Sequence, residues 1–228
     1  MKYFNLKAVN VAIQRLSDEN SRYEHRVGSI AGTILPIYFT PDKYTITPEQ
    51  IQRGTFKRPD FTIEKVDENR LIVHCFVELK SLFNSSFNDI LDQLSDSILY
   101  TMNNNPNVSA FIIAIKGLKI AFYTYHNCIN ILDDADICHY KGFIPLHYSL
   151  SYKEYLSANP DSSLIDYLKH IKRFPYDWGS NEELTRNGVE MTENLPYPHI
   201  FDLLKHKEYV HKLFQYASSQ VPGTEILD

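Results

Sequence analysis

The eleven-residue run at 70–80, RLIVHCFVELK, constrains the fold of this 228-residue chain more than any other segment. Successive side chains of a strand point to opposite faces, and both alternating sets in this run are largely apolar. Charged residues return only toward its end, at Glu78 and Lys80. A strand that is apolar on both faces is typical of a sheet covered on each side by other layers. The run therefore predicts the central strand of a layered α/β core.

Three more segments are rich in β-branched and aromatic residues and are predicted to be strands. They lie at 60–66, 109–115 and 119–126. The residues DEN at 67–69 predict a turn that pairs the first of these segments with 70–80 as a hairpin. The residues KGL at 116–118 predict a second hairpin.

Apolar residues near helical spacing predict helices before, between and after these strands. They fall within 6–34, 84–104 and 198–220. Residues 34–39 are predicted as a short strand or an extended lead-out, and prolines favour a loop at 40–54. The order of elements predicts a mixed α/β core over residues 1–150 and a helical extension packed on it over residues 151–228.

The charge balance argues weakly against binding to nucleic acid by global attraction, because the formal net charge is −5. A local basic groove remains compatible with that total. The best candidates for phosphate contacts are Lys57 and Arg58, and Lys172 and Arg173 in the run KHIKRF at 169–174.

Cysteine usage and hydropathy indicate the compartment. Three cysteines without a CxxC pair suit a reducing environment. The first sixteen residues lack the continuous apolar core of a signal peptide, and the longest apolar run, at 110–115, is far too short to span a membrane. We therefore expect a soluble intracellular protein of the cytoplasm or nucleus, without a membrane partner.

The predicted hairpin brings three charged residues together. Glu78 and Lys80 are two apart on one strand and therefore share a face. The turn at 67–69 places Asp60 on the neighbouring strand, opposite a residue near 76–78. Two adjacent carboxylates repel each other unless a cation lies between them, and hard oxygen ligands favour Mg²⁺ or Mn²⁺. The nearby lysine can polarise a water and compensate the charge of an approaching phosphate.

These residues resemble a known family. Pro59-Asp60 followed by Glu78-Leu79-Lys80 is similar to the motif of the PD-(D/E)xK nuclease superfamily, and the order of helix, hairpin, helix and further strands also fits. The resemblance implies a restriction-endonuclease-like αβββαβ core with a mixed central sheet. It also implies that Asp60, Glu78 and the main-chain carbonyl of Leu79 bind the metal, and that Lys80 positions the attacking water.

The same resemblance suggests two further site residues. Many members of the superfamily carry an acidic residue on the helix before the hairpin, which corresponds here to Glu24 or, as a second choice, Glu19. Several subgroups carry a glutamine on the helix after the lysine, which corresponds to Gln93. Each of these residues is also compatible with an ordinary solvated position on a helix.

The sequence therefore predicts a Mg²⁺- or Mn²⁺-dependent nuclease acting on DNA rather than RNA, with a homodimer as one possible assembly. Two alternatives remain open. The chain could be a catalytically silent nuclease-fold module that binds nucleic acid or a protein partner. It could also be an unrelated α/β protein, in which Asp60, Glu78 and Lys80 are ordinary charges at the edge of a sheet.

Overall fold

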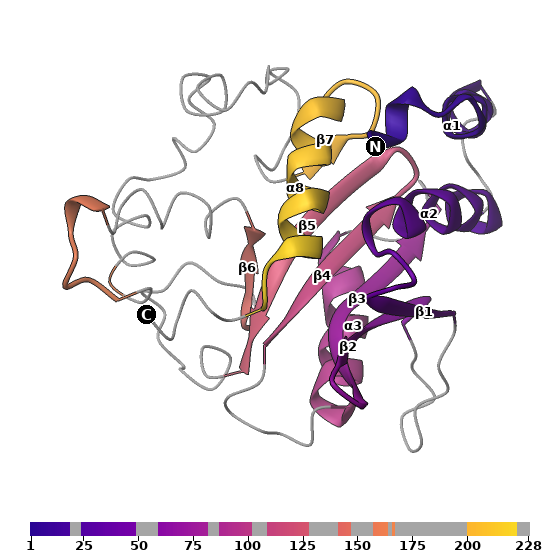
Figure 1. The fold of residues 1–228 in the computed structure, drawn as a ribbon. Coiled ribbons are helices and arrows are strands. Elements are labelled where there is room, and N and C mark those ends of the chain that lie inside the picture. Colours follow the sequence, from indigo (N-terminus) through magenta and orange to yellow (C-terminus); the bar gives the residue numbers. More distant parts are fainter. Residues whose placement is uncertain are drawn as a thin grey trace.

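The strands that the structure describes form one mixed sheet, drawn in Figure 1. This computed structural model describes residues 1–18, 24–48, 59–81, 87–101, 109–127, 141–146, 157–163, 166 and 200–222. The strands are β1 (Tyr44–Pro48), β2 (Phe61–Asp67), β3 (Arg70–Lys80), β4 (Ser109–Lys116), β5 (Lys119–His126), β6 (Phe143–Pro145) and β7 (Ile200–Asp202). The helices are α1 (Lys7–Asp18), α2 (Glu24–Tyr38), α3 (Phe87–Thr101) and α8 (Lys207–Ser219), preceded by a 3-10 turn at Tyr3–Asn5.

Strand β3 occupies the interior of the sheet, as its apolar faces predict. The strand order is β1-β2-β3-β4-β5-β6, and β7 also pairs with β5. β3 pairs antiparallel with β2 and parallel with β4, and the other pairs are antiparallel. Residues 74–79 are all buried. The predicted mixed α/β core and both predicted hairpins are therefore confirmed.

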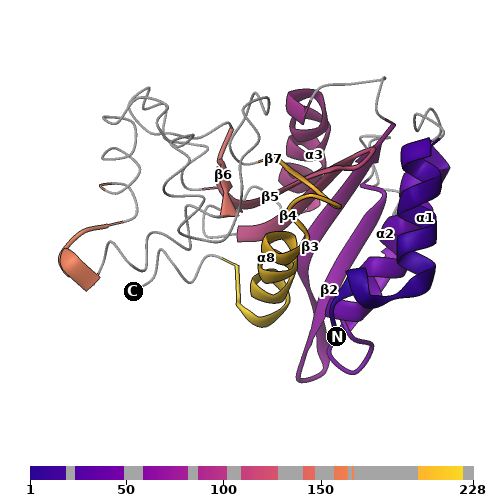
Figure 2. The ribbon, with the colours of Figure 1, turned by 90° about the horizontal axis from the view of Figure 1, so that it is seen from above.

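Helices cover both faces of this sheet, as Figure 2 shows. Helices α1, α2 and α8 pack on one face, where they share a core with Val77, Ile113 and Phe122. Helix α3, which connects the parallel strands β3 and β4, packs on the other face against Phe76 and Ile112. The central strand is consequently shielded from water on both sides.

The alternation of side chains along β3 is interrupted by a β-bulge. Ile63 pairs with Cys75 while Glu64 pairs with Val73, so His74 is an extra residue in the ladder. Strict alternation along 70–80 would predict His74 on the same face as Glu78, and this expectation is wrong because of the bulge. Its imidazole is buried on the opposite face, where Nε2 lies 2.7 Å from the carbonyl oxygen of Ala217 in α8. His74 is therefore a packed core residue.

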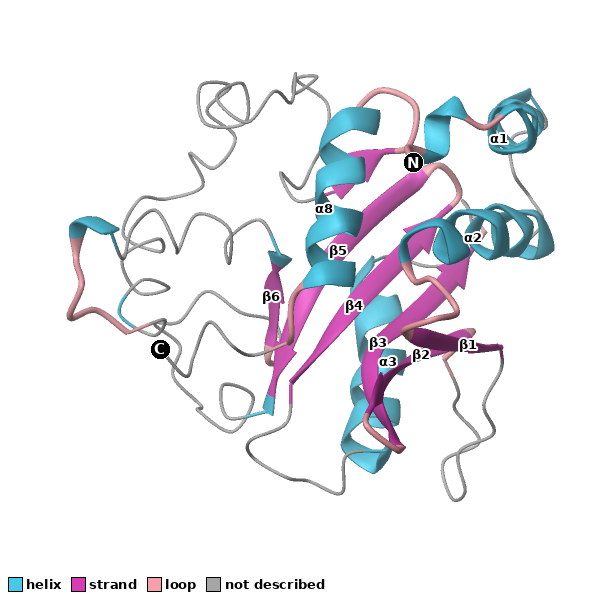
Figure 3. Cartoon of the chain, viewed as in Figure 1, coloured by secondary structure: helices cyan, strands magenta, loops and turns pink. Residues whose placement is uncertain are grey.

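Two segments near the N-terminus differ from their predictions. Residues 34–39 do not form a strand, because α2 continues through Pro36 to Tyr38. The buried stripe of this helix extends over Ile34 and Leu35, and this burial outweighs the one hydrogen bond that the proline removes. The predicted loop at 40–54 contains the edge strand β1, which ends at Pro48, where an edge strand tolerates proline. Figure 3 shows this strand beside β2.

The C-terminal segment contributes to the same layered core. The helix predicted over 198–220 begins only at Lys207, because residues Ile200–Asp202 pair with β5 as a strand. Helix α8 then buries Val210, Leu213 and Phe214 against the sheet. The expected boundary near residue 150 lies outside the described residues. None of the helices that the structure describes combines the length and apolar character needed to cross a membrane.

Candidate functional site

The hairpin of β2 and β3 brings Asp60, Glu78 and Lys80 together. The last ladder pair at this end of the hairpin joins Phe61 to Val77, and continuing the register by one residue sets Asp60 opposite Glu78. Residues directly opposite each other in an antiparallel pair have their side chains on the same face. Lys80 follows two residues later on that face.

Hydrogen bonds connect these residues directly. The main-chain N–H of Asp60 donates to Oε2 of Glu78 over 3.3 Å, and the main-chain N–H of Leu79 donates to Oδ2 of Asp60 over 2.7 Å. The ammonium group of Lys80 donates to Oε1 of Glu78. Each acid is therefore held by a group from the opposite strand, and the lysine is held by the acid beside it.

The electrostatics of the site centre on Glu78, whose side chain is only 1 % exposed. Burial raises the pKa of Glu78 to about 7, and the charge of Asp60 acts in the same direction, against the hydrogen bond and charge of Lys80. Burial alone would lower the pKa of Lys80, but the bond to Glu78 and the surrounding negative charges outweigh it and raise that pKa. Near neutral pH the site therefore favours an additional positive charge, either a proton or a cation.

Pro59 explains how a main-chain oxygen can join the carboxylates. The same register sets Pro59 opposite Leu79, and β2 itself begins only at Phe61. Proline has no N–H, so Pro59 cannot donate a ladder hydrogen bond to the carbonyl of Leu79. The N–H of Leu79 points toward Asp60, and the N–H and C=O of one strand residue point to the same side. The carbonyl oxygen of Leu79 is thus directed toward the Asp60 side of the strand.

These donors fit a small, hard divalent cation. No cluster of three or more His, Cys, Asp or Glu side chains suited to a metal occurs among the described residues. The available set is instead two carboxylates and one carbonyl. Magnesium typically binds through one or two carboxylates and retains several waters, so this set suits Mg²⁺ or Mn²⁺ better than an ion that requires a complete protein cage.

Glu24 and Gln93, the two helix residues that the resemblance suggests, are placed differently relative to Asp60, Glu78 and Lys80. Glu24 is the first residue of α2, is exposed, and contributes to the raised pKa of Lys80. One turn later, a Cβ placed on Gly28 would lie 3.7 Å from Cδ1 of Leu79, so the start of α2 packs over the end of β3. Glu19 lies outside the described residues.

Gln93 lies on α3 and is partly exposed. Its main-chain carbonyl accepts a hydrogen bond from Oγ of Ser97 over 3.3 Å. Within the part of the chain that the structure describes, no hydrogen bond joins Gln93 to the three charged residues of the hairpin. Its role therefore stays a prediction.

The predicted basic contacts, Lys57, Arg58, Lys172 and Arg173, lie outside the described residues. The structure instead brings a different lysine next to the site. Lys116, at the end of β4, is the register partner of Lys80. Sequence spacing cannot reveal this neighbour, because the parallel pairing of β3 with β4 depends on the intervening helix.

Comparisons of this chain with family models, with curated proteins and with solved structures found no match. The functional interpretation therefore depends on the residues of the hairpin and on their geometry.

Proposed function

We propose that this protein is a divalent-metal-dependent nuclease that hydrolyses phosphodiester bonds, with DNA as its expected substrate. The observation that carries the proposal is the burial of Glu78 on an interior strand, between the carboxylate of Asp60 and the ammonium of Lys80.

The burial of Glu78 argues against an ordinary surface ion pair. Exposed salt bridges form at little cost, whereas burying a carboxylate costs several kcal/mol even when it is paired. β3 lies between β2 and β4, so Glu78 is not at a sheet edge. Well-packed apolar residues in place of the whole Glu78–Lys80 pair would commonly give an equally or more stable protein. A costly carboxylate beside a second one is what a cation site requires.

The residues of the chain divide the chemistry among them. Asp60, Glu78 and the carbonyl of Leu79 would hold Mg²⁺ or Mn²⁺, which when bound supplies Lewis-acid polarisation of a phosphoryl oxygen and a more acidic water. Lys80, held by Glu78, presents its ammonium to orient the attacking water by hydrogen bonding. The same positive charge stabilises the negative charge that develops on the phosphoryl group during attack.

A second candidate function keeps the fold without the reaction. A silent module would bind nucleic acid or a protein partner, and the net charge of −5 favours the protein partner because it is unusual for a protein that must attract a polyanion. Such a module has no need for a metal. Calorimetry with Mn²⁺ separates the two functions, because only the nuclease requires binding that depends on Asp60 and Glu78.

The test of the nuclease proposal uses the whole chain and its Lys80→Ala variant with single- and double-stranded DNA and RNA, in Mg²⁺ or Mn²⁺. We expect cleavage by the wild type, abolished by EDTA and reduced at least about 100-fold in the variant. Lys65→Ala, which removes the same charge from the neighbouring strand, is the matched control and should retain activity. Equal activity, or equal inactivity, of wild type and Lys80→Ala contradicts the proposal.

A further inference from the structure

Three lysines lie side by side at one end of the sheet. Lys80 ends β3, Lys116 ends β4 and Lys119 begins β5. The register pairs Lys80 with Lys116, and Lys116 with Lys119. Register partners on neighbouring strands have their side chains on the same face, so the three lysine side chains leave the sheet in a row on the face that carries Glu78.

The charges in this row are compensated differently. The ammonium of Lys80 is bonded to Glu78, and that of Lys119 lies 3.2 Å from Oδ2 of Asp202 in β7. Lys116 is partly exposed, and no residue that the structure describes forms an ion pair or hydrogen bond with its ammonium. It therefore offers a positive charge beside the site.

The fold fixes Lys116 relative to the acids. Adjacent strands are separated by about 4.8 Å, so Lys116 lies one strand away from Lys80. The N–H of Gly117 donates to the carbonyl of Lys80 over 3.0 Å, which ties the turn between β4 and β5 to the end of β3. Gly117 has a φ of 59°, a conformation that glycine adopts without strain.

This position is also where an open α/β sheet usually binds its ligands. β3 and β4 are the parallel pair of the sheet, and Glu78, Lys80 and Lys116 lie at the carboxyl ends of these two strands. Ligands of such sheets bind in the crevice outside the carboxyl ends of parallel strands. A polyanion that reaches Asp60 and Glu78 therefore passes close to Lys116.

We propose that Lys116 binds a phosphate of the nucleic-acid backbone next to the phosphodiester group at Asp60, Glu78 and Lys80. This inference rests on the proposed function and deepens it, because it makes a run of consecutive phosphates the feature that the site recognises. Lys116 is a binding residue: it contacts a phosphate that does not react, so it stabilises the bound substrate and the transition state equally.

The test measures binding separately from cleavage. A labelled 20-base-pair DNA duplex is titrated with protein in EDTA at 50–200 mM NaCl, and fluorescence anisotropy gives the affinity and its salt dependence. For Lys116→Ala we expect about 5- to 20-fold weaker binding and a log–log salt slope smaller by about 0.9, the value for one lost phosphate contact. Lys116→Arg, which keeps the charge, should restore most of the affinity.

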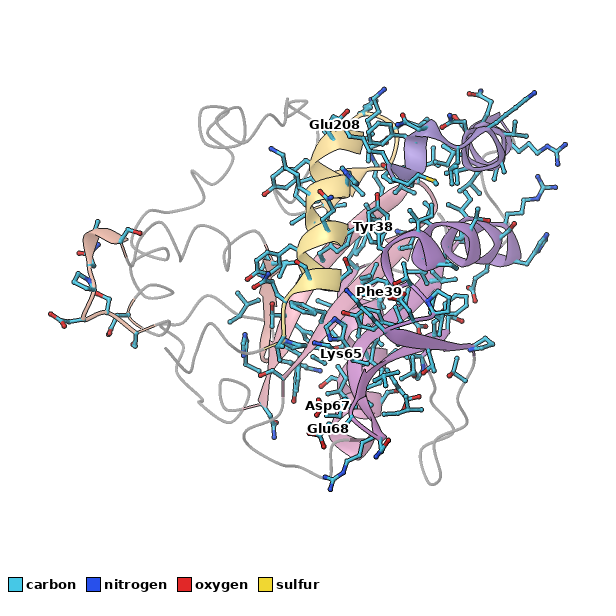
Figure 4. All side chains as sticks on the ribbon, viewed as in Figure 1. Tyr38, Phe39, Lys65, Asp67, Glu68 and Glu208 are labelled. Carbon is cyan, nitrogen blue, oxygen red and sulfur yellow. The ribbon has the colours of Figure 1, made fainter. Side chains whose placement is uncertain are left out.

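Two further lysines are matched controls. Lys119→Ala should change the affinity less than about twofold, because Asp202 already compensates that charge. Lys65→Ala should behave like the wild type, since Lys65 lies toward the far tip of the β2–β3 hairpin, near Asp67 and Glu68 (Figure 4). In Mg²⁺, Lys116→Ala should raise KM and leave kcat nearly unchanged.

The outcomes separate this inference from the proposed function. If the wild type cleaves DNA but Lys116→Ala binds with the same affinity and salt slope, the phosphate contact is wrong and the nuclease stands. If the wild type binds DNA through Lys116 but never cleaves it, the contact stands and the nuclease is wrong. If Lys65→Ala weakens binding as much as Lys116→Ala, net charge alone explains the effect and the contact is wrong.

Discussion

Two buried ionisable residues on β3, only four positions apart, behave in opposite ways. Burial lowers the pKa of His74 to about 4, so at neutral pH this side chain is in the uncharged form that its surroundings favour. Burial raises the pKa of Glu78 to about 7, so at neutral pH this side chain is close to half ionised. The folded protein therefore favours the form of His74 that is present at neutral pH, whereas it disfavours the charge that Glu78 partly carries.

The surroundings of the two residues explain the difference. The imidazole of His74 packs among aromatic rings, including Phe39 and Tyr44, and bonds to the carbonyl of Ala217, so it attaches α8 to the sheet. Glu78 instead faces a second carboxylate and one ammonium. A buried polar group with satisfied partners stabilises a fold, whereas a buried carboxyl group whose charge is disfavoured by its neighbour marks a candidate functional site.

The largest expected effect is that of replacing Glu78. In Glu78→Gln, a side chain of similar shape loses its charge, so we expect cleavage to fall at least about 100-fold and calorimetric binding of Mn²⁺ to disappear. The unfolding free energy without metal should stay equal or increase at neutral pH, because the raised pKa of Glu78 means that the folded protein disfavours the charge that is removed.

Glu64→Gln is the matched control, since Glu64 is a partly exposed acid on the neighbouring strand β2. It should bind Mn²⁺ and cleave like the wild type. Retained Mn²⁺ binding in Glu78→Gln would show that the carboxylate has only a structural role.

The next largest expected effect is that of replacing His74. His74→Ala removes both the packed ring and the hydrogen bond to Ala217, so we expect a loss of about 3 kcal/mol in the free energy of unfolding by urea. The specific activity of the folded fraction should stay within about twofold. His25→Ala, which alters an exposed histidine of α2, should change stability by less than about 0.5 kcal/mol. A loss of activity without a loss of stability would contradict the structural role of His74 and would make it a functional residue.

The smallest effect is the pH dependence of stability, because the two residues oppose each other. The pKa of His74 is lower in the folded than in the unfolded chain, so its contribution decreases by up to about 3 kcal/mol as pH falls from 6.5 to 4. The pKa of Glu78 is raised on folding, so its contribution is complete below its ordinary value of 4.5 and is lost as pH rises through about 7.

Urea unfolding between pH 4 and 8 distinguishes these contributions. His74→Phe should remove the loss toward acid and make the variant relatively more stable at pH 4.5 than at pH 7.5. Glu78→Gln should remove the opposite trend and become relatively less stable at pH 4.5. Parallel pH profiles for the wild type and both variants would contradict the assigned shifts.

Much of the fold could be predicted because it depends on local patterns. The apolar faces of 70–80 predict an interior strand, and the turn at 67–69 predicts the hairpin that brings Asp60 near the end of that strand. Elements without a distinct pattern were missed. β1 and β7 are short strands that exist because β2 and β5 offer main-chain groups for pairing, which no window of local sequence reports.

The sequence by itself determined the hairpin and the two strands that carry its three charged residues, since a short turn between two strand-like segments suffices for that. The register next to the turn, which pairs Asp67 with Arg70, would set Asp60 opposite Val77, so the bulge at His74 is what brings Asp60 to the face of Glu78. Only the tertiary structure decided that His74 leaves that face through a bulge, that Glu78 is buried, and that Lys116 lies beside Lys80. These properties depend on parallel pairing and on helices packed from distant parts of the chain, and burial and charge compensation arise only once those layers are assembled.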